Sequence, residues 1–147
     1  MIDTTLPIGV FDSGMGGLTV LRALQAELPS ESFIYLGDSA RLPYGNKSIA
    51  TVQQYALQTS AALVDRGIKA LVVACNTASA AALPLLVEKY APLPVFGVIE
   101  PGAQAAAHAA CGSMVLVLAT EGTVMDGTYQ RALLAADADL TVYARSC

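Results

Sequence analysis

Residues 70–79, ALVVACNTAS, contain a short apolar run that passes directly into polar residues and a helical stretch. The run, Ala70–Ala74, has the length and composition of a buried β-strand, and Cys75 ends it. Similar runs lie along the chain, each bounded by Gly, Pro, Ser or Asp. The other strand candidates are Ile8–Phe11, Phe33–Gly37, Val95–Ile99, Met114–Ala119 and Leu140–Ala144.

Segments with the apolar spacing of helices separate these strand candidates. Leucines recur every three or four residues between Leu18 and Leu28, and Pro29 ends that pattern. A second apolar stripe runs from Ile49 to Leu63. Alternation of strands and helices favours a parallel sheet with right-handed crossovers. We therefore predict an α/β fold built on a doubly wound parallel sheet.

The composition suits this fold and argues against several classes of protein. Apolar residues make up 54% of the 147 residues, as expected for strands covered on both faces by helices. The apolar runs are too short to span a bilayer. The net charge of −4, with Arg and Lys scattered singly, provides no basic face for nucleic acid. The first residues lack a signal peptide, so we expect a cytoplasmic protein.

The three cysteines are too far apart to indicate a disulfide framework, and with a single histidine they do not predict a zinc site. Any cysteine function would be that of a reduced thiol. We expect Cys111 to pack in the interior, and His108 to be exposed or near a helix end. Tyr129, which has helical spacing to apolar neighbours, is also expected to pack.

Polar residues follow most of the predicted strands. Ligands of open parallel sheets bind at the carboxyl ends of the strands, so these residues are candidates for a site. Each of them, taken singly, could instead cap the helix that follows. The residues are Asp12, Ser13, Gly14, Asp38, Ser39, Cys75, Asn76, Thr77, Glu100 and Thr120.

The glycine-rich turn at residues 14–17, GMGG, is a candidate anion site because it lets backbone amides approach a ligand at a helix end. It lacks the G-x-G-x-x-G pattern of dinucleotide folds and the lysine of a P-loop, which argues against a nucleotide. A carboxylate would suit the turn, and Ser13 adds a hydroxyl. The alternative interpretation is a plain tight turn.

Cys75 is the strongest candidate for chemistry. At the start of a helix, free N–H groups and the helix dipole stabilise a thiolate. The alternative is a buried cysteine that packs as a small apolar side chain. Asn76 and Thr77 favour the first interpretation, because a packing site does not need an amide and a hydroxyl directly after the sulfur, whereas a bound amino acid could use both.

Four segments resemble glutamate racemases of the aspartate/glutamate racemase family in order and spacing. A further segment, residues 119–133, resembles the family's second domain. LPYG and GVIEPG resemble the glutamate enzymes more than the aspartate enzymes. The four segments are GVFDSGMGGLTVL at 9–21, GDSARLPYG at 37–45, ACNTAS at 74–79 and GVIEPG at 97–102.

The resemblance implies interconversion of L- and D-glutamate without a cofactor or metal, supplying D-glutamate for peptidoglycan. It implies that Cys75 is one catalytic acid/base at Cα, and that a second cysteine acts on the opposite face. No lysine lies in a setting typical of pyridoxal phosphate. The substrate-binding positions implied by the resemblance are Asp12, Ser13, Tyr44, Gly45, Asn76 and Thr77. Asp12 could also orient the thiol or the substrate ammonium, or cap the helix from Gly16.

The sequence departs from the family in lacking the later G-C-T-H segment that carries the second catalytic cysteine. Cys147 does not resemble that cysteine. We expect residues 1–98 to form the first domain and 99–147 an incomplete second domain, with apolar faces left exposed. A homodimer or a complementing C-terminal half would then be the partner, and activity of this chain alone is doubtful. The alternatives are a non-catalytic dicarboxylate-binding remnant, and a racemase or isomerase acting on aspartate or a related acid.

Overall fold

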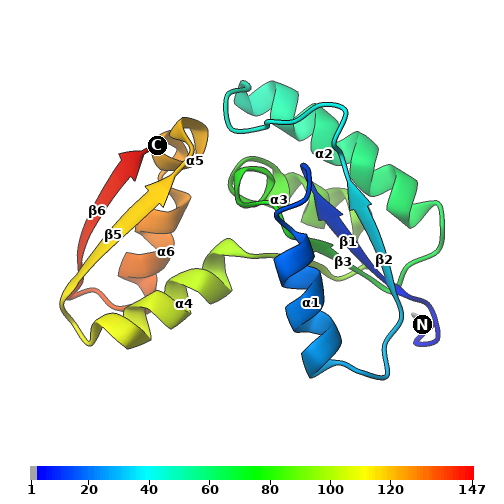
Figure 1. Cartoon of the computed structure of the whole chain (residues 1–147), viewed down its shortest axis with the longest axis horizontal. Coiled ribbons are helices and arrows are strands. Elements are labelled where there is room, and N and C mark those ends of the chain that lie inside the picture. Colours follow the sequence, from blue (N-terminus) through cyan, green and yellow to red (C-terminus); the bar gives the residue numbers. More distant parts are fainter. Residues whose placement is uncertain (1–2) are drawn as a thin grey trace.

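The computed structural model describes residues 3–147, which form two parallel sheets with helices packed against them (Figure 1). The four-stranded sheet has the order β2-β1-β3-β4, and the two-stranded sheet pairs β5 with β6. The strands are β1 (Ile8–Asp12), β2 (Phe33–Gly37), β3 (Ala70–Val73), β4 (Val95–Gly97), β5 (Met114–Ala119) and β6 (Thr141–Ser146). The helices are α1 (Leu18–Glu27), α2 (Ile49–Val64), α3 (Asn76–Tyr90), α4 (Ile99–Ala110), α5 (Glu121–Asp126) and α6 (Thr128–Ala136).

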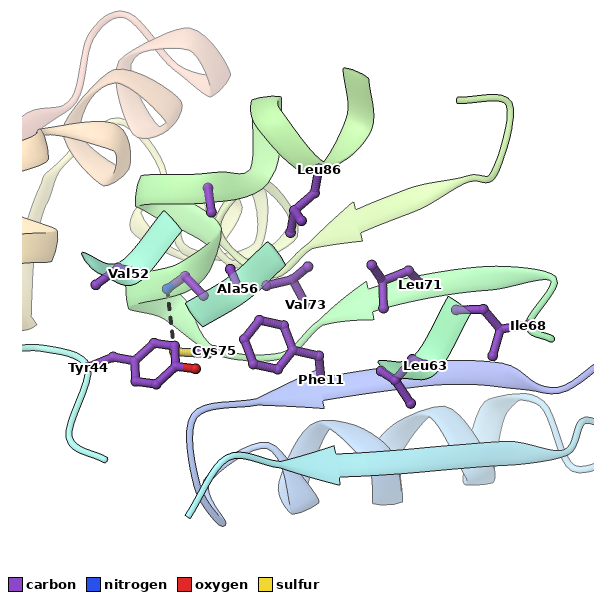
Figure 2. Packing of buried hydrophobic residues seen from close by; sticks show 12 residues of the cluster. Phe11, Tyr44, Val52, Ala56, Leu63, Ile68, Leu71, Val73, Cys75 and Leu86 are labelled. Carbon is purple, nitrogen blue, oxygen red and sulfur yellow. Dashed lines mark hydrogen bonds between the residues drawn. The ribbon is translucent and has the colours of Figure 1, made fainter. Parts of the chain in front are cut away.

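The predicted doubly wound α/β fold is confirmed in the four-stranded sheet. Alternation along β1 sends Val10 to the face covered by α1, and Phe11 to the face covered by α2 and α3. Figure 2 shows the second of these cores, in which Phe11 and Val73 lie among side chains from α2 and α3. Both faces of the strands are therefore buried, which explains their nearly continuous apolar sequence.

The chain reverses the direction of its crossovers at β1. Strand β1 pairs with β2 on one edge and with β3 on the other, so α1 and α2 cross on opposite faces of the sheet. The loops that follow β1 and β3 consequently emerge side by side, where sheets of this type bind ligands. A backbone hydrogen bond from Ala74 N to Phe11 O, at 2.7 Å, extends this pairing to the edge of the site.

Strands β4 and β6 differ from their predicted bounds by up to two residues, while β1 and β3 differ by one. The predicted strand Val95–Ile99 ends at Gly97, and Ile99 begins α4 instead. Pro101 lies in the first turn of α4, where backbone N–H groups have no partner within the helix, so proline is tolerated there. Strand β6 begins after Leu140, which is buried, and continues to Ser146.

The two-stranded sheet is covered on one face only. Helices α4 and α6 bury Val115 and Val117 against a small core around Leu133. On the opposite face the side chains of Leu116 and Leu118 are 58% and 61% exposed. The predicted exposed apolar face, the β5 face, is thus present. Its large exposed side chains are Met114, Leu116, Leu118 and Tyr143.

The expected division between residues 98 and 99 falls between β4 and α4, where one sheet ends and the segment leading to the other begins. Within residues 3–147, the helices are too short or too polar to cross a bilayer.

Candidate active site

Cys75 lies at the junction of β3 and α3, as its position in the sequence predicts. It is the N-cap of α3, and its sulfur accepts a hydrogen bond from the Ala78 backbone N–H at 3.4 Å. The thiol also donates to the Ser13 hydroxyl at 3.2 Å, from the loop that follows β1. Only 6% of Cys75 is exposed, and Figure 2 shows it at the end of the core beside Tyr44 and Phe11. The sulfur therefore combines apolar packing with two polar contacts.

Ser13 reaches the sulfur because of the strand alternation in β1. Asp12 points to the α1 side of the sheet, and its carboxylate accepts hydrogen bonds from the Gly14 N–H at 3.0 Å and the Tyr35 hydroxyl at 3.3 Å. The next side chain, that of Ser13, turns to the opposite side and reaches the sulfur at the end of β3. The alternative in which Asp12 caps the following helix is wrong, because the N-cap of α1 is Gly17 and no side chain caps it.

The glycine-rich loop is packed tightly against the end of β2. A Cβ atom on Gly37 would lie 2.1 Å from the Gly14 carbonyl oxygen, and one on Gly17 would lie 2.6 Å from the Asp12 Cβ. Neither position can hold a larger residue unless the loop moves. The Gly14 carbonyl also accepts from the Tyr35 hydroxyl at 3.0 Å. The loop is therefore held in place by both backbone contact and Tyr35.

The loop after β2 carries a second polar group. The Tyr44 hydroxyl donates to the Asp38 carboxylate at 2.6 Å, and both residues are buried. Arg41 pairs with the same carboxylate oxygen at 2.6 Å and lies over the ring of Tyr55. Burial, and then the bond to Asp38, raise the pKa of Tyr44. The Tyr44 hydroxyl thus remains protonated and bound to Asp38.

The start of α3 faces the end of β5. The Thr77 hydroxyl lies 3.2 Å from that of Thr120 and 3.4 Å from that of Thr123, and these two lie 2.9 Å apart. The Tyr129 hydroxyl donates to Asn76 Oδ1 at 2.6 Å. Side chains of all five residues line a cavity of about 400 Å³ that runs along β5.

Sequence reasoning missed three residues near the site. Tyr129 is not only a packing residue as predicted, because its hydroxyl binds Asn76. Thr123 lies one helical turn after Thr120, a spacing that could have indicated a shared contact. Tyr35 carries no local signal, since its position in β2 is that of an ordinary strand residue.

The other cysteines lie outside this group of contacts. The prediction that Cys111 packs in the interior is wrong: it is exposed and follows α4 with a left-handed backbone at φ 49°. Cys147 is exposed, and its thiol contacts the Ala119 carbonyl. His108 is exposed in the last turn of α4, as predicted. Among residues 3–147, no three His, Cys, Asp or Glu side chains are grouped in a way that could hold a metal.

The site thus brings together a thiol, a hydroxyl and a carboxylate beside the start of a helix. The thiolate form of such a cysteine can accept a proton and the thiol can return it, while nearby amides and hydroxyls can hold an anionic ligand. The structure brings Ser13 to Cys75 at the carboxyl ends of β1 and β3, where Asp12 directly precedes Ser13. It connects Thr77 to Thr120, after β5, and Asn76 to Tyr129 in α6. Tyr44 contributes a buried ring to the same core.

Comparison with known proteins gives one consistent result. The model of the family described as Asp/Glu/Hydantoin racemase matches residues 10–146. Glutamate racemase from Geobacter metallireducens is 50% identical over 140 residues, which are 95% of this chain and 52% of that protein. The chain therefore spans about half the length of the curated relatives it matches.

Solved structures agree with the sequence comparison. Glutamate racemase isoform RacE1 from Bacillus anthracis matches with a TM-score of 0.91 at 44% identity, over 97% of this chain and 53% of that one. Glutamate racemase from Francisella tularensis, solved in complex with D-glutamate, matches with a TM-score of 0.89 at 40% identity, over the same shares.

Proposed function

Because the chain belongs to the Asp/Glu/Hydantoin racemase family, we propose that it forms one half of a cofactor-independent glutamate racemase. Its proposed reaction is the interconversion of L- and D-glutamate in the cytoplasm, where a thiol stays reduced. The D-glutamate would supply peptidoglycan synthesis. The observation that carries the proposal is the Cys75 sulfur at the start of α3, in contact with Ser13 from the neighbouring strand.

Cys75 is the proposed acid/base for one face of the substrate. Its thiolate takes the Cα proton and becomes a thiol, and the electron pair of the broken C–H bond passes to Cα and the adjoining carboxylate. A donor on the opposite face then returns a proton to Cα, which inverts the configuration. The Cα proton is very weakly acidic, so the site must stabilise the developing negative charge through hydrogen bonds in a largely dry setting.

The proposed ligand contacts follow from the charges of glutamate. Asp12 is buried, and among residues 3–147 no Lys or Arg side chain forms an ion pair with it. A substrate ammonium group would supply the missing positive charge. Ser13, the amide of Asn76 and the hydroxyl of Thr77 can donate to carboxylates. Tyr44 and Gly45 would contribute through their backbone, since the Tyr44 hydroxyl is bound to Asp38.

The second proton donor is proposed to come from polypeptide equivalent to the other half of the relatives. Two features support this partner over a second copy of the chain. The relatives are about twice as long as this chain, and within residues 3–147 strand β5 pairs with β6 alone while its outer face remains exposed. An unpaired strand edge beside an apolar face is suited to accept further strands and helices.

Hydrogen exchange at Cα tests the catalytic role of Cys75. The chain is incubated with L-glutamate and, separately, with D-glutamate in heavy water, and deuterium at Cα is measured by mass spectrometry. We expect slow exchange of one enantiomer, lost in Cys75→Ser and Cys75→Ala and kept in Cys111→Ser, whose cysteine is exposed outside the site. Saturable glutamate binding without exchange would instead identify a binding module. Faster exchange with aspartate than with glutamate would identify aspartate as the substrate.

Complementation tests the proposed partner. The chain is co-expressed with the part of the Geobacter metallireducens enzyme that lies outside the match, and D-glutamate formation from L-glutamate is measured. We expect turnover only when both parts are present, and none with Cys75→Ser. If this chain alone racemises glutamate and sedimentation shows it to be a dimer, that result would contradict the complementing half and support the homodimer.

A further inference from the structure

The Tyr35 hydroxyl lies between two oxygen atoms that can only accept hydrogen bonds. It is 3.0 Å from the Gly14 carbonyl oxygen and 3.3 Å from Oδ2 of Asp12. Within residues 3–147, Gly14 O receives no backbone donor. The two acceptors therefore share the single proton of Tyr35. Without it the Gly14 carbonyl would lose its donor, whereas Oδ2 of Asp12 would keep the Gly14 N–H at 3.0 Å.

Both of these acceptors belong to the segment that carries Ser13. Asp12 and Gly14 flank Ser13 in the chain, and Ser13 is the residue that contacts the Cys75 sulfur. The segment leans on β2, where the Gly14 carbonyl lies directly over the Cα of Gly37. A bond from β2 to this carbonyl therefore determines where Ser13 sits relative to the sulfur.

Tyr35 is suited to this task because its environment keeps it protonated. Its ring packs on the α1 side of the sheet with Val10 and Val72. Burial, followed by the charge and hydrogen bond of Asp12, raises the pKa of Tyr35 to about 12. The hydroxyl is consequently a permanent donor at any physiological pH.

We propose that Tyr35 is a positioning residue whose hydroxyl fixes the Asp12–Gly14 segment and thereby holds Ser13 against the Cys75 sulfur. That this arrangement serves racemisation rests on the proposed function. The positioning itself does not, because it concerns only groups already in contact in this chain. Tyr35 touches neither the sulfur nor a substrate; it acts through its neighbours.

The rate at which iodoacetamide alkylates Cys75 measures this positioning directly. Tyr35→Phe removes the hydroxyl and keeps the ring. Because the loop then lacks one hydrogen bond, we expect its open form to be more populated and Cys75 to be alkylated about fivefold faster. Site-resolved mass spectrometry reads each cysteine separately. The exposed Cys111 is the internal reference, and its rate should be the same in every variant.

Tyr90→Phe is the matched control. The Tyr90 hydroxyl also donates to a backbone carbonyl, that of Leu57 at 3.3 Å, but it lies at the opposite end of α3 from Cys75. This variant should lose about as much global stability as Tyr35→Phe, but the rate at which iodoacetamide alkylates Cys75 should not change. If both variants accelerate alkylation equally, or if neither does, the proposal is overturned.

A double variant tests whether Tyr35 acts through Ser13. Ser13→Ala should also speed alkylation of Cys75, and the double variant should be no faster than the faster single variant, because both changes release the same contact. If the accelerations of Cys75 alkylation in the two single variants multiply in the double variant, the proposal is overturned. Deuterium exchange at the Cα of glutamate, measured with the wild-type chain, tests racemisation separately. If no exchange occurs, the proposed function is refuted, but the alkylation rates still decide the role of Tyr35.

Discussion

The substitution Gly37→Ala should displace the glycine-rich loop without any strain in the backbone of β2. An added Cβ would lie 2.1 Å from the Gly14 carbonyl oxygen, whereas ordinary contacts begin near 3.4 Å, so the carbonyl must retreat by about 1.3 Å. That movement breaks its 3.0 Å bond to Tyr35. Forced overpacking costs about 1–3 kcal/mol and the lost hydrogen bond about 1 kcal/mol. We therefore expect a loss of about 2–4 kcal/mol in the free energy of unfolding.

Urea unfolding followed by circular dichroism measures this loss. For a domain of this size the midpoint should fall by about 1–2 M. Gly16→Ala is the matched control, since an added Cβ there meets nothing within 4 Å, and its midpoint should stay within about 0.3 M of wild type. Equal midpoints for the two variants would refute the steric reasoning, and with it the claim that the Gly37–Gly14 contact holds the loop.

Three further predictions concern Tyr44, Tyr35 and the β5 face. Tyr44→Phe leaves the buried Asp38 without its 2.6 Å donor, and calorimetry should show a loss of about 1.5–3 kcal/mol. The stability advantage of wild type over Tyr35→Phe should be complete below pH 10 and disappear between pH 10 and about 12 in urea titrations, because the folded state raises the pKa of Tyr35 and binds its proton more tightly than the unfolded state. Leu118→Lys, on the exposed β5 face, should change the free energy of unfolding of the chain by less than about 0.5 kcal/mol. It should nevertheless abolish complementation, and retention of turnover in that variant would argue against the β5 face as the docking surface.

Several features of the site were predictable because their signals are local. The apolar run Ala70–Ala74 followed by polar residues indicated a strand that passes into a helix, and the structure has Cys75 at that N-cap. The choice of a parallel sheet followed from the alternation of strands and helices. Boundaries were less certain where an apolar residue suits both elements: Ile99 continues a strand pattern in sequence, yet it begins α4.

Contacts between distant segments could not be predicted in the same way. Neither the approach of Thr123 to Thr77 nor that of Tyr129 to Asn76 has a trace in local sequence, because each joins a residue of α3 to a helix about 50 residues later in the chain. The exposure of Cys111 was likewise missed, since an apolar side chain after a helix can turn inward or outward depending on what packs there.

The order of residues was sufficient to predict which groups stand at strand ends and that one thiol begins a helix, since strand and helix periodicity and capping are properties of neighbours in the chain. Which of these groups touch was decided by the folded chain alone. The strand order β2-β1-β3 brings Tyr35 to Asp12 and Gly14 from one side and Cys75 to Ser13 from the other. That order arises from crossovers packing on opposite faces of the sheet, which involves segments too far apart in sequence to leave a local pattern.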